Sequence, residues 1–206
     1  VLSKKLAAGS THALIDVPVG PTAKVRNQAG AEALADLLRF VGASLGLTVD
    51  VLVTDGTQPV GRGIGPALEA IDVLAVLRRT PDAPDDLRAR AVELAGHLLD
   101  LAPGAVAGTG RDRALALLDS GAAEAKFMAI CAAQGSFQEP ECAARHIEIL
   151  APHAGELTAV DNRRIARIAK LAGAPRQQRA GVRLLVRTGD CVDKGQPLYE
   201  LHAETP

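Results

Sequence analysis

The residue best suited to hold an anion is a lysine that follows the first apolar run of the chain. Residues 13–19 (Ala-Leu-Ile-Asp-Val-Pro-Val) read as a strand that Gly20 and Pro21 end, and Lys24 comes shortly after them. In open α/β sheets, ligands bind beyond the carboxyl ends of the strands. An ammonium group there, with Thr22 nearby, could hold a phosphate as a point charge. A solvated loop lysine is an equally good interpretation, and the residues alone leave both open.

A second candidate, Lys4, lies in the short helical run that opens the chain. Lys4 and Lys5 stand near the end of residues 1–8, where Gly9 provides a stop. Val1 is not a Met, so we expect this run to be the end of a helix that belongs to a longer protein. Lysines near a helix C-terminus complement the helix dipole, and composition alone favours that structural interpretation for Lys4.

Glycines and acids elsewhere are weaker candidates. Residues 55–59 (Asp-Gly-Thr-Gln-Pro) follow a second strand, and three alternating glycines then lead into a helix: Gly61, Gly63 and Gly65. Such glycines can bring backbone amides close to an anion. The GxGxxG fingerprint is missing, however, so we interpret them as turns and close packing. Glu139 and Glu141 flank a proline and are most simply part of a solvated linker.

Histidines and cysteines form no site by spacing. The five histidines are scattered, and Cys131, Cys142 and Cys191 match neither a zinc pattern nor a redox pair. An odd number of cysteines fits reduced thiols, so we expect a cytoplasmic protein. The sequence predicts no metal site and no cofactor, and it identifies no catalytic residue in this chain.

Bulk composition excludes several classes of function. Lys and Arg total 23 against 24 Asp and Glu, and the net charge of −1 gives no general electrostatic hold on nucleic acid or on an anionic membrane. No apolar run reaches the length of about 18 residues that a membrane-spanning helix needs. Aromatic residues make up only 2%, so the core must be built from Ala, Val, Leu and Ile.

The order of predicted elements indicates an α/β fold. Strands at 13–19 and 48–54 flank a helix, and this βαβ unit implies a parallel sheet. Pro66 opens the next helix. Another follows Pro84, with one apolar face formed by Leu87, Ala91, Leu94, Leu98 and Leu101. Two Ala-rich helices are expected near 111–120 and 122–133.

The character of the chain changes near residue 135. Short β-like runs at 146–150, 155–160 and 182–186 surround a helix at 162–171, and the end is rich in hairpins. We therefore predict a parallel, βαβ-containing sheet with helices, followed by a small β-rich, barrel-sandwich-like α+β module. The predicted parts are the end of a helix from another domain (1–10), the remainder of an α/β domain (11–134), a linker (135–145) and the C-terminal module (146–206).

The terminal stretch 189–198 also resembles lipoyl or biotinyl carrier modules. Those carriers present a modifiable lysine in a Met-Lys-Met or Asp-Lys-Ala hairpin, and neither is present here. We interpret the likeness as shared architecture. A non-catalytic carrier or interaction module is the alternative from a different class of function.

Six blocks along the chain form a recognisable pattern: Ser3–His12, Ile15–Gly20, Ala23–Val25, Gln58–Gly61, Ile64–Ala70 and Gly195–Glu204. In this order they resemble one enzyme family, the AMP phosphorylase branch of the thymidine phosphorylase family, and the resemblance runs along essentially the whole chain.

The resemblance implies a two-domain pentosyltransferase that cleaves an N-glycosidic bond with inorganic phosphate as co-substrate. Lys4 matches the family lysine that contacts the base, and Lys24 matches the lysine that contacts AMP in the AMP-specific branch. The implied partners are phosphate and a nucleoside or nucleoside monophosphate, in a homo-oligomer without nucleic acid or membrane. Thymidine and AMP both stay open as substrates. The family's glycine-rich phosphate-binding segment is not in this chain, so we expect the chain alone to be inactive.

Overall fold

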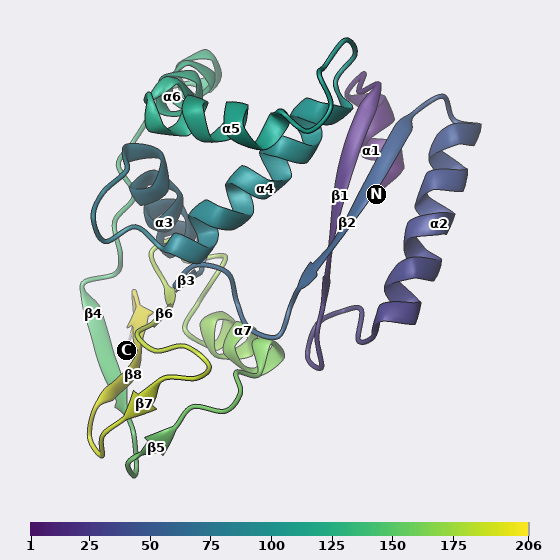
Figure 1. Ribbon diagram of the computed structural model, residues 1–206. Coiled ribbons are helices and arrows are strands. Elements are labelled where there is room, and N and C mark those ends of the chain that lie inside the picture. The colour runs from purple at the N-terminus through teal and green to yellow at the C-terminus, as the bar shows by residue number, and fades with distance from the viewer. Residues whose placement is uncertain (206) are drawn as a thin grey trace. The chain divides into compact units, whose positions relative to one another are not determined.

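Two parallel strands with a helix between them open the fold, and antiparallel strands close it (Figure 1). The computed structural model describes residues 1–205, in which helices and strands are mixed as predicted. The predicted fold class is confirmed. The chain divides into two compact units: unit 1 comprises residues 1–57 and 89–117, and unit 2 comprises residues 58–88 and 118–206.

The core of unit 1 is the βαβ element. β1 (His12–Val19) pairs in parallel with β2 (Thr48–Asp55), from His12 opposite Thr48 to Val19 opposite Asp55. α2 (Gln28–Ser44) packs on this pair through small residues that a close approach requires, and the buried cluster consists of Val17, Ala31, Ala35 and Val51. The short helix α1 (Leu2–Ala7) adds a second cluster, in which Leu2 meets Ala13 and Leu47.

The helices α4 (Asp85–Leu101) and α5 (Gly110–Asp119) meet at two glycines. A Cβ atom on Gly110 would collide with the carbonyl oxygen of Gly96, so only glycine permits this approach. α4 consequently buries Val92 and Gly96. The predicted apolar face of this helix was therefore wrong in part, because Ala91 and Leu98 are exposed.

Unit 2 is built on a four-stranded antiparallel sheet with strand order β3-β6-β8-β4. Its strands are β3 (Gly63–Ile64), β6 (Gly181–Leu184), β8 (Pro197–Ala203) and β4 (Arg145–Leu150). The amphipathic helix α7 (Asn162–Leu171) packs on one face, around buried Ala169, Val182 and Leu184. The remaining elements are α3 (Pro66–Arg78), α6 (Ala122–Gln134), and the paired short strands β5 (Gly155–Glu156) and β7 (Cys191–Val192).

The segment between α6 and β4 has no helix or strand, but it is held by ion pairs. Glu139 accepts two hydrogen bonds from the Arg78 guanidinium, at 2.5 and 3.0 Å, and Glu141 pairs with Arg179 at 3.0 Å. Both acids are exposed, as expected for a solvated linker, and each also has a cationic partner distant in sequence. The predicted domain limits stay predictions.

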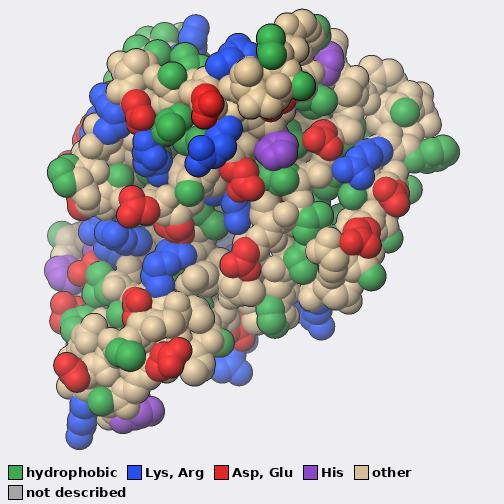
Figure 2. Space-filling model, viewed as in Figure 1, with side chains coloured by type: hydrophobic (Ala, Val, Ile, Leu, Met, Phe, Trp, Pro, Cys, Tyr) green, Lys and Arg blue, Asp and Glu red, His purple; other side chains and the backbone are tan. Residues whose placement is uncertain are grey.

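Charges of both signs are interspersed on the face that Figure 2 shows, as the near-zero net charge leads one to expect. Among residues 1–205, no helix combines the length and the apolar character that crossing a membrane requires.

Candidate functional site

The loop that carries Lys24 closes back onto the carboxyl end of β1. The Gly20 amide donates to the Val25 carbonyl at 3.2 Å, the Ala23 amide donates to the Gly20 carbonyl at 3.1 Å, and Val25 forms a parallel bridge with Val19. These backbone contacts fix the position of Lys24 beside the strand end, where ligands of open α/β sheets collect.

Two glycines let the neighbouring strand end approach this loop. A Cβ on Gly20 would collide with the carbonyl oxygen of Gly56, and a Cβ on Gly56 would crowd Pro18. The Gly56 amide donates to the Val19 carbonyl at 2.8 Å. Beyond it, the Asp55 carboxylate accepts from the amide and the hydroxyl of Thr57, at 2.9 and 3.1 Å. Both strand ends are thus rigid turns with polar groups.

Lys24 itself is exposed, and its ammonium has no hydrogen-bond or ion-pair partner among residues 1–205. The helix α2 begins a few residues later, with Asn27 as its N-cap accepting from the Gly30 amide at 2.8 Å. A helix N-terminus carries partial positive charge. The loop therefore offers a cation that no carboxylate neutralises, in a region that favours anions.

Lys4 lies on a different element of the same unit. It stands in the last turn of α1, exposed, and its carbonyl accepts from the Ala8 amide at 3.2 Å. The structure thus places the two predicted residues on different elements of unit 1, and neither ammonium has a hydrogen-bond or ion-pair partner among residues 1–205.

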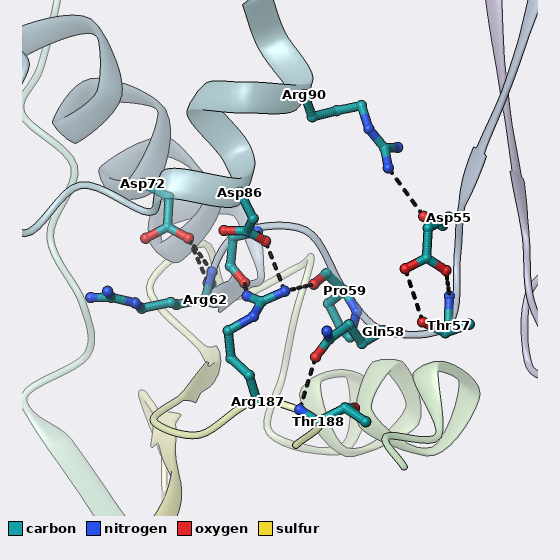
Figure 3. Close-up of polar contacts among 12 residues, drawn as sticks. Asp55, Thr57, Gln58, Pro59, Arg62, Asp72, Asp86, Arg90, Arg187 and Thr188 are labelled. Atoms are coloured by element: carbon teal, nitrogen blue, oxygen red, sulfur yellow. Dashed lines mark hydrogen bonds and ion pairs between the residues drawn. The ribbon is translucent and has the colours of Figure 1, made fainter. Parts of the chain in front are cut away.

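A polar network that sequence reasoning missed braces the same two strands. Arg90 of α4 donates to the Asp55 carbonyl at 3.2 Å (Figure 3). It also donates to the Thr54 hydroxyl at 2.8 Å and lies 3.4 Å from the Asp16 carboxylate. The Thr54 hydroxyl donates to Asp16 at 2.6 Å. The signal was Asp16 itself, a charge inside an apolar strand, which calls for a buried partner.

The glycine-rich segment 58–66 was predicted to serve turns and packing, and the structure agrees. Its amides are already bound by the protein's own carboxylates. Asp72 accepts from the amides of Arg62 and Gly63, at 2.6 and 2.7 Å, and Asp86 accepts from Gly61 at 2.9 Å. The Gly65 amide donates to Glu69 at 3.0 Å. No donor among these four remains for a phosphate.

A long-range contact anchors this segment to the C-terminal module. The Arg187 guanidinium pairs with Asp86 at 2.9 Å and donates to the carbonyls of Pro59 and Gly61, at 3.2 and 3.3 Å (Figure 3). The Thr188 amide donates to the Gln58 side chain at 3.1 Å. Since these partners lie far apart in sequence, no local pattern could have indicated them.

The cysteines form no disulfide. Burial raises the pKa of the Cys142 thiol above its ordinary value, an effect that the nearby Arg183 charge opposes. The thiolate, which is the reactive form, is thereby disfavoured.

Comparison with known proteins places these features in context. Residues 156–206 match the family model described as the pyrimidine nucleoside phosphorylase C-terminal domain. Over all of its length, the chain is 57% identical to a protein of Polaromonas sp. (strain JS666) and 54% identical to proteins of Legionella pneumophila (strain Paris) and Hahella chejuensis. Each of these relatives carries the name "Putative thymidine phosphorylase". The chain spans about two fifths of the length of these relatives, 40–41%.

Proposed function

We propose that this chain is a portion of a thymidine phosphorylase family protein, and that the full-length protein is a pentosyltransferase that cleaves a nucleoside with inorganic phosphate. For thymidine, the products are thymine and 2-deoxyribose 1-phosphate. Phosphate attacks the anomeric carbon, the bond to the base breaks, and the departing base takes the electron pair. The similarity along the whole chain to relatives named for this activity supports the proposal.

Two lysines have distinct roles in this proposal. The ammonium of Lys4 supports negative charge on the departing base, which is the charge that develops in the transition state. Lys24 holds a 5′-phosphate if the substrate is a nucleoside monophosphate. The observation behind this second role is that its ammonium, beyond the carboxyl end of β1, has no partner among residues 1–205. AMP is therefore the alternative substrate to thymidine.

Parallel assays of the full-length protein with thymidine and AMP distinguish the substrates. Activity on AMP alone would remove thymidine from the proposal, and activity on thymidine alone would remove the phosphate-holding role of Lys24. A carrier function would instead require a lipoyl or biotinyl adduct, which intact-mass spectrometry would detect.

Single lysine variants test the two roles. Lys24→Ala should lower kcat/KM for AMP about tenfold to a hundredfold, the loss expected for one charged hydrogen bond, and should spare an unphosphorylated nucleoside. Lys4→Ala should lower kcat/KM for both. Arg26→Ala and Lys5→Ala are matched controls, since each removes an exposed cation beside the tested lysine. Equal losses on both substrates for Lys24→Ala would assign Lys24 a structural or shared role.

The remaining parts of the proposal concern the setting of the enzyme. We place it in the cytoplasm as a homo-oligomer that needs no cofactor, with phosphate as co-substrate, and its three free thiols suit a reducing compartment. These 206 residues alone should not release base from a nucleoside, because catalysis needs both reactants held in one geometry. Phosphate-dependent base release by the purified chain would contradict this.

A further inference from the structure

The sheet of unit 2 has one apolar and one polar face. Val182 and Leu184 of β6 pack under α7, and the intervening Arg183 therefore points to the opposite face. In the strand register, Arg183 lies opposite Gly63 of β3 on one side and opposite Glu200 of β8 on the other. A guanidinium and a carboxylate thus stand side by side on a sheet face that is not the hydrophobic core.

A cavity of about 360 Å³ opens on this polar face, entirely within unit 2. Its charged lining combines three arginines with three carboxylates: Arg62, Arg183, Arg187, Asp82, Asp190 and Glu200. Ligand sites commonly have volumes from about 300 Å³ upward, so a small molecule fits here.

Some of these charges are already bound to partners. Arg187 is held by Asp86 and two backbone carbonyls, as described above. The Asp190 carboxylate accepts from the Arg187 amide at 2.7 Å, and the Glu200 carboxylate lies 3.2 Å from a ring nitrogen of His202.

Two guanidinium groups of the cavity lack a carboxylate partner. The Arg183 side chain makes no hydrogen bond or ion pair within residues 1–205. The only partner of the Arg62 guanidinium in that range is the Asp82 carbonyl, at 3.3 Å. Figure 3 shows the Arg62 side chain extending away from the Arg187 guanidinium. The Arg183 donors, and those of Arg62 other than Nη1, are therefore available for a ligand.

The groups around the Asp82 carboxylate lower its pKa. Its pKa lies below the ordinary value, first because the Thr80 side chain and its own backbone donate hydrogen bonds to it, and further because of the positive charges of Arg62 and Arg183. Asp82 therefore stays ionised beside these arginines and remains an acceptor. A bare anion would be repelled by the cavity's carboxylates, whereas a ligand with hydroxyl donors as well as an anionic group satisfies both signs.

We propose that this cavity binds a small sugar phosphate. The phosphate dianion lies on the guanidinium groups of Arg62 and Arg183, which offer the planar, forked donors that suit phosphate. The sugar hydroxyls donate to the carboxylates of Asp82 and Glu200, as acidic side chains do for ribose hydroxyls in dinucleotide sites. All residues of this site belong to unit 2, whereas the Lys24 loop belongs to unit 1.

Isothermal titration of the full-length protein with ribose 5-phosphate tests the proposal. The Lys24→Ala variant is used as background, so that the proposed phosphate contact of the substrate site is removed. Arg183→Gln and Arg62→Gln should each weaken binding about tenfold to a hundredfold, since each removes a charged hydrogen bond. Arg176→Gln is the matched control, because it changes an exposed arginine of the same unit outside the cavity. Unchanged affinity in both Arg62→Gln and Arg183→Gln would overturn the site.

Two further arms test the ligand class. Inorganic phosphate should bind more weakly than ribose 5-phosphate, and ribose more weakly still, because each supplies half of the contacts. Asp82→Ala should weaken ribose 5-phosphate binding but not phosphate binding, since it removes an acceptor and a repelling charge together. Phosphate binding as tightly as ribose 5-phosphate would overturn the role of the hydroxyls. A crystal structure with ribose 5-phosphate located outside the cavity would overturn the assignment altogether.

Discussion

The Lys24 loop and the glycine-rich segment 58–66 look alike in sequence, yet their polar groups have opposite fates. Both follow a strand and contain glycines with polar neighbours. In the Lys24 loop, the ammonium has no protein partner in the described chain. In segment 58–66, the backbone amides already donate hydrogen bonds to carboxylates from other parts of the chain, Asp86 and the buried Asp72. A glycine-rich turn is therefore an anion site only when the protein leaves its donors unoccupied.

The largest effect is expected from removing the carboxylate that binds the backbone amides of segment 58–66. Asp72 is 5% exposed, and Asp72→Ala would leave the partly buried amides of Arg62 and Gly63 without an acceptor. Two lost hydrogen bonds to a charged group should cost about 3–6 kcal/mol of stability. Calorimetric melting of the full-length protein measures the loss.

Two variants sharpen this prediction. Asp72→Asn keeps an acceptor but loses the charge, so it should lower the melting temperature less than Asp72→Ala. Asp193→Ala removes an exposed carboxylate with no side-chain partner in the described chain and should have almost no effect. Equal melting temperatures for Asp72→Ala and the wild type would show that these amides do not need Asp72.

The second prediction concerns the strands that carry the Lys24 loop. The Arg90 side chain is 16% exposed and the Asp16 side chain 28% exposed. Arg90→Leu would remove the cation beside Asp16 and the donors to Thr54 and Asp55. Removing one partner of a fully buried ion pair costs about 3–5 kcal/mol. Because Arg90 and Asp16 are only partly buried, we expect a smaller loss of stability, about 2–4 kcal/mol.

A double-mutant cycle separates this network from its parts. Asp16→Asn should cost less than Arg90→Leu, and the double variant should cost less than the sum of the two single losses, because both remove the same interaction. Thermal denaturation of the four proteins supplies the comparison. Strict additivity would mean that Arg90 stabilises unit 1 through contacts other than Asp16.

Sequence periodicity predicted the elements well, because each depends on neighbours in the chain. The apolar run 13–19 and the apolar spacing after Pro66 correspond to β1 and α3, and the helical run 162–171 is α7. The helix faces were harder to predict. Close glycine contacts such as that of Gly96 with Gly110 determine which face of a helix is buried, and glycines do not contribute to a pattern of apolar side chains.

The candidate site could be predicted only where it is local. Lys24 comes shortly after a strand in the sequence and lies beside the end of that strand in the structure, so its position could be predicted. Arg187 reaches Gly61 across a separation of 126 residues, and nothing near either residue indicates the other. Asp16 and Asp72 did carry a signal, since an acid within an apolar element needs a partner. The sequence shows that such a partner is required but does not identify it.

The smallest expected effect concerns the surface, where charge pairs contribute little because solvent screens them. Glu139 accepts a hydrogen bond from Arg78, and this bond, followed by the attraction of the Arg78 charge, holds the pKa of the Glu139 carboxyl below its ordinary value of 4.5. A carboxyl with a depressed pKa in the folded state stabilises the fold above its ordinary pKa. That contribution disappears as the pH falls through the folded-state value.

The melting temperatures of the wild type and Glu139→Gln should therefore differ slightly at neutral pH and converge below about pH 4. High salt at neutral pH should also reduce the difference. A difference that grew on acidification would have the wrong sign for this ion pair and would assign the effect of Glu139 to its packing in the segment before β4.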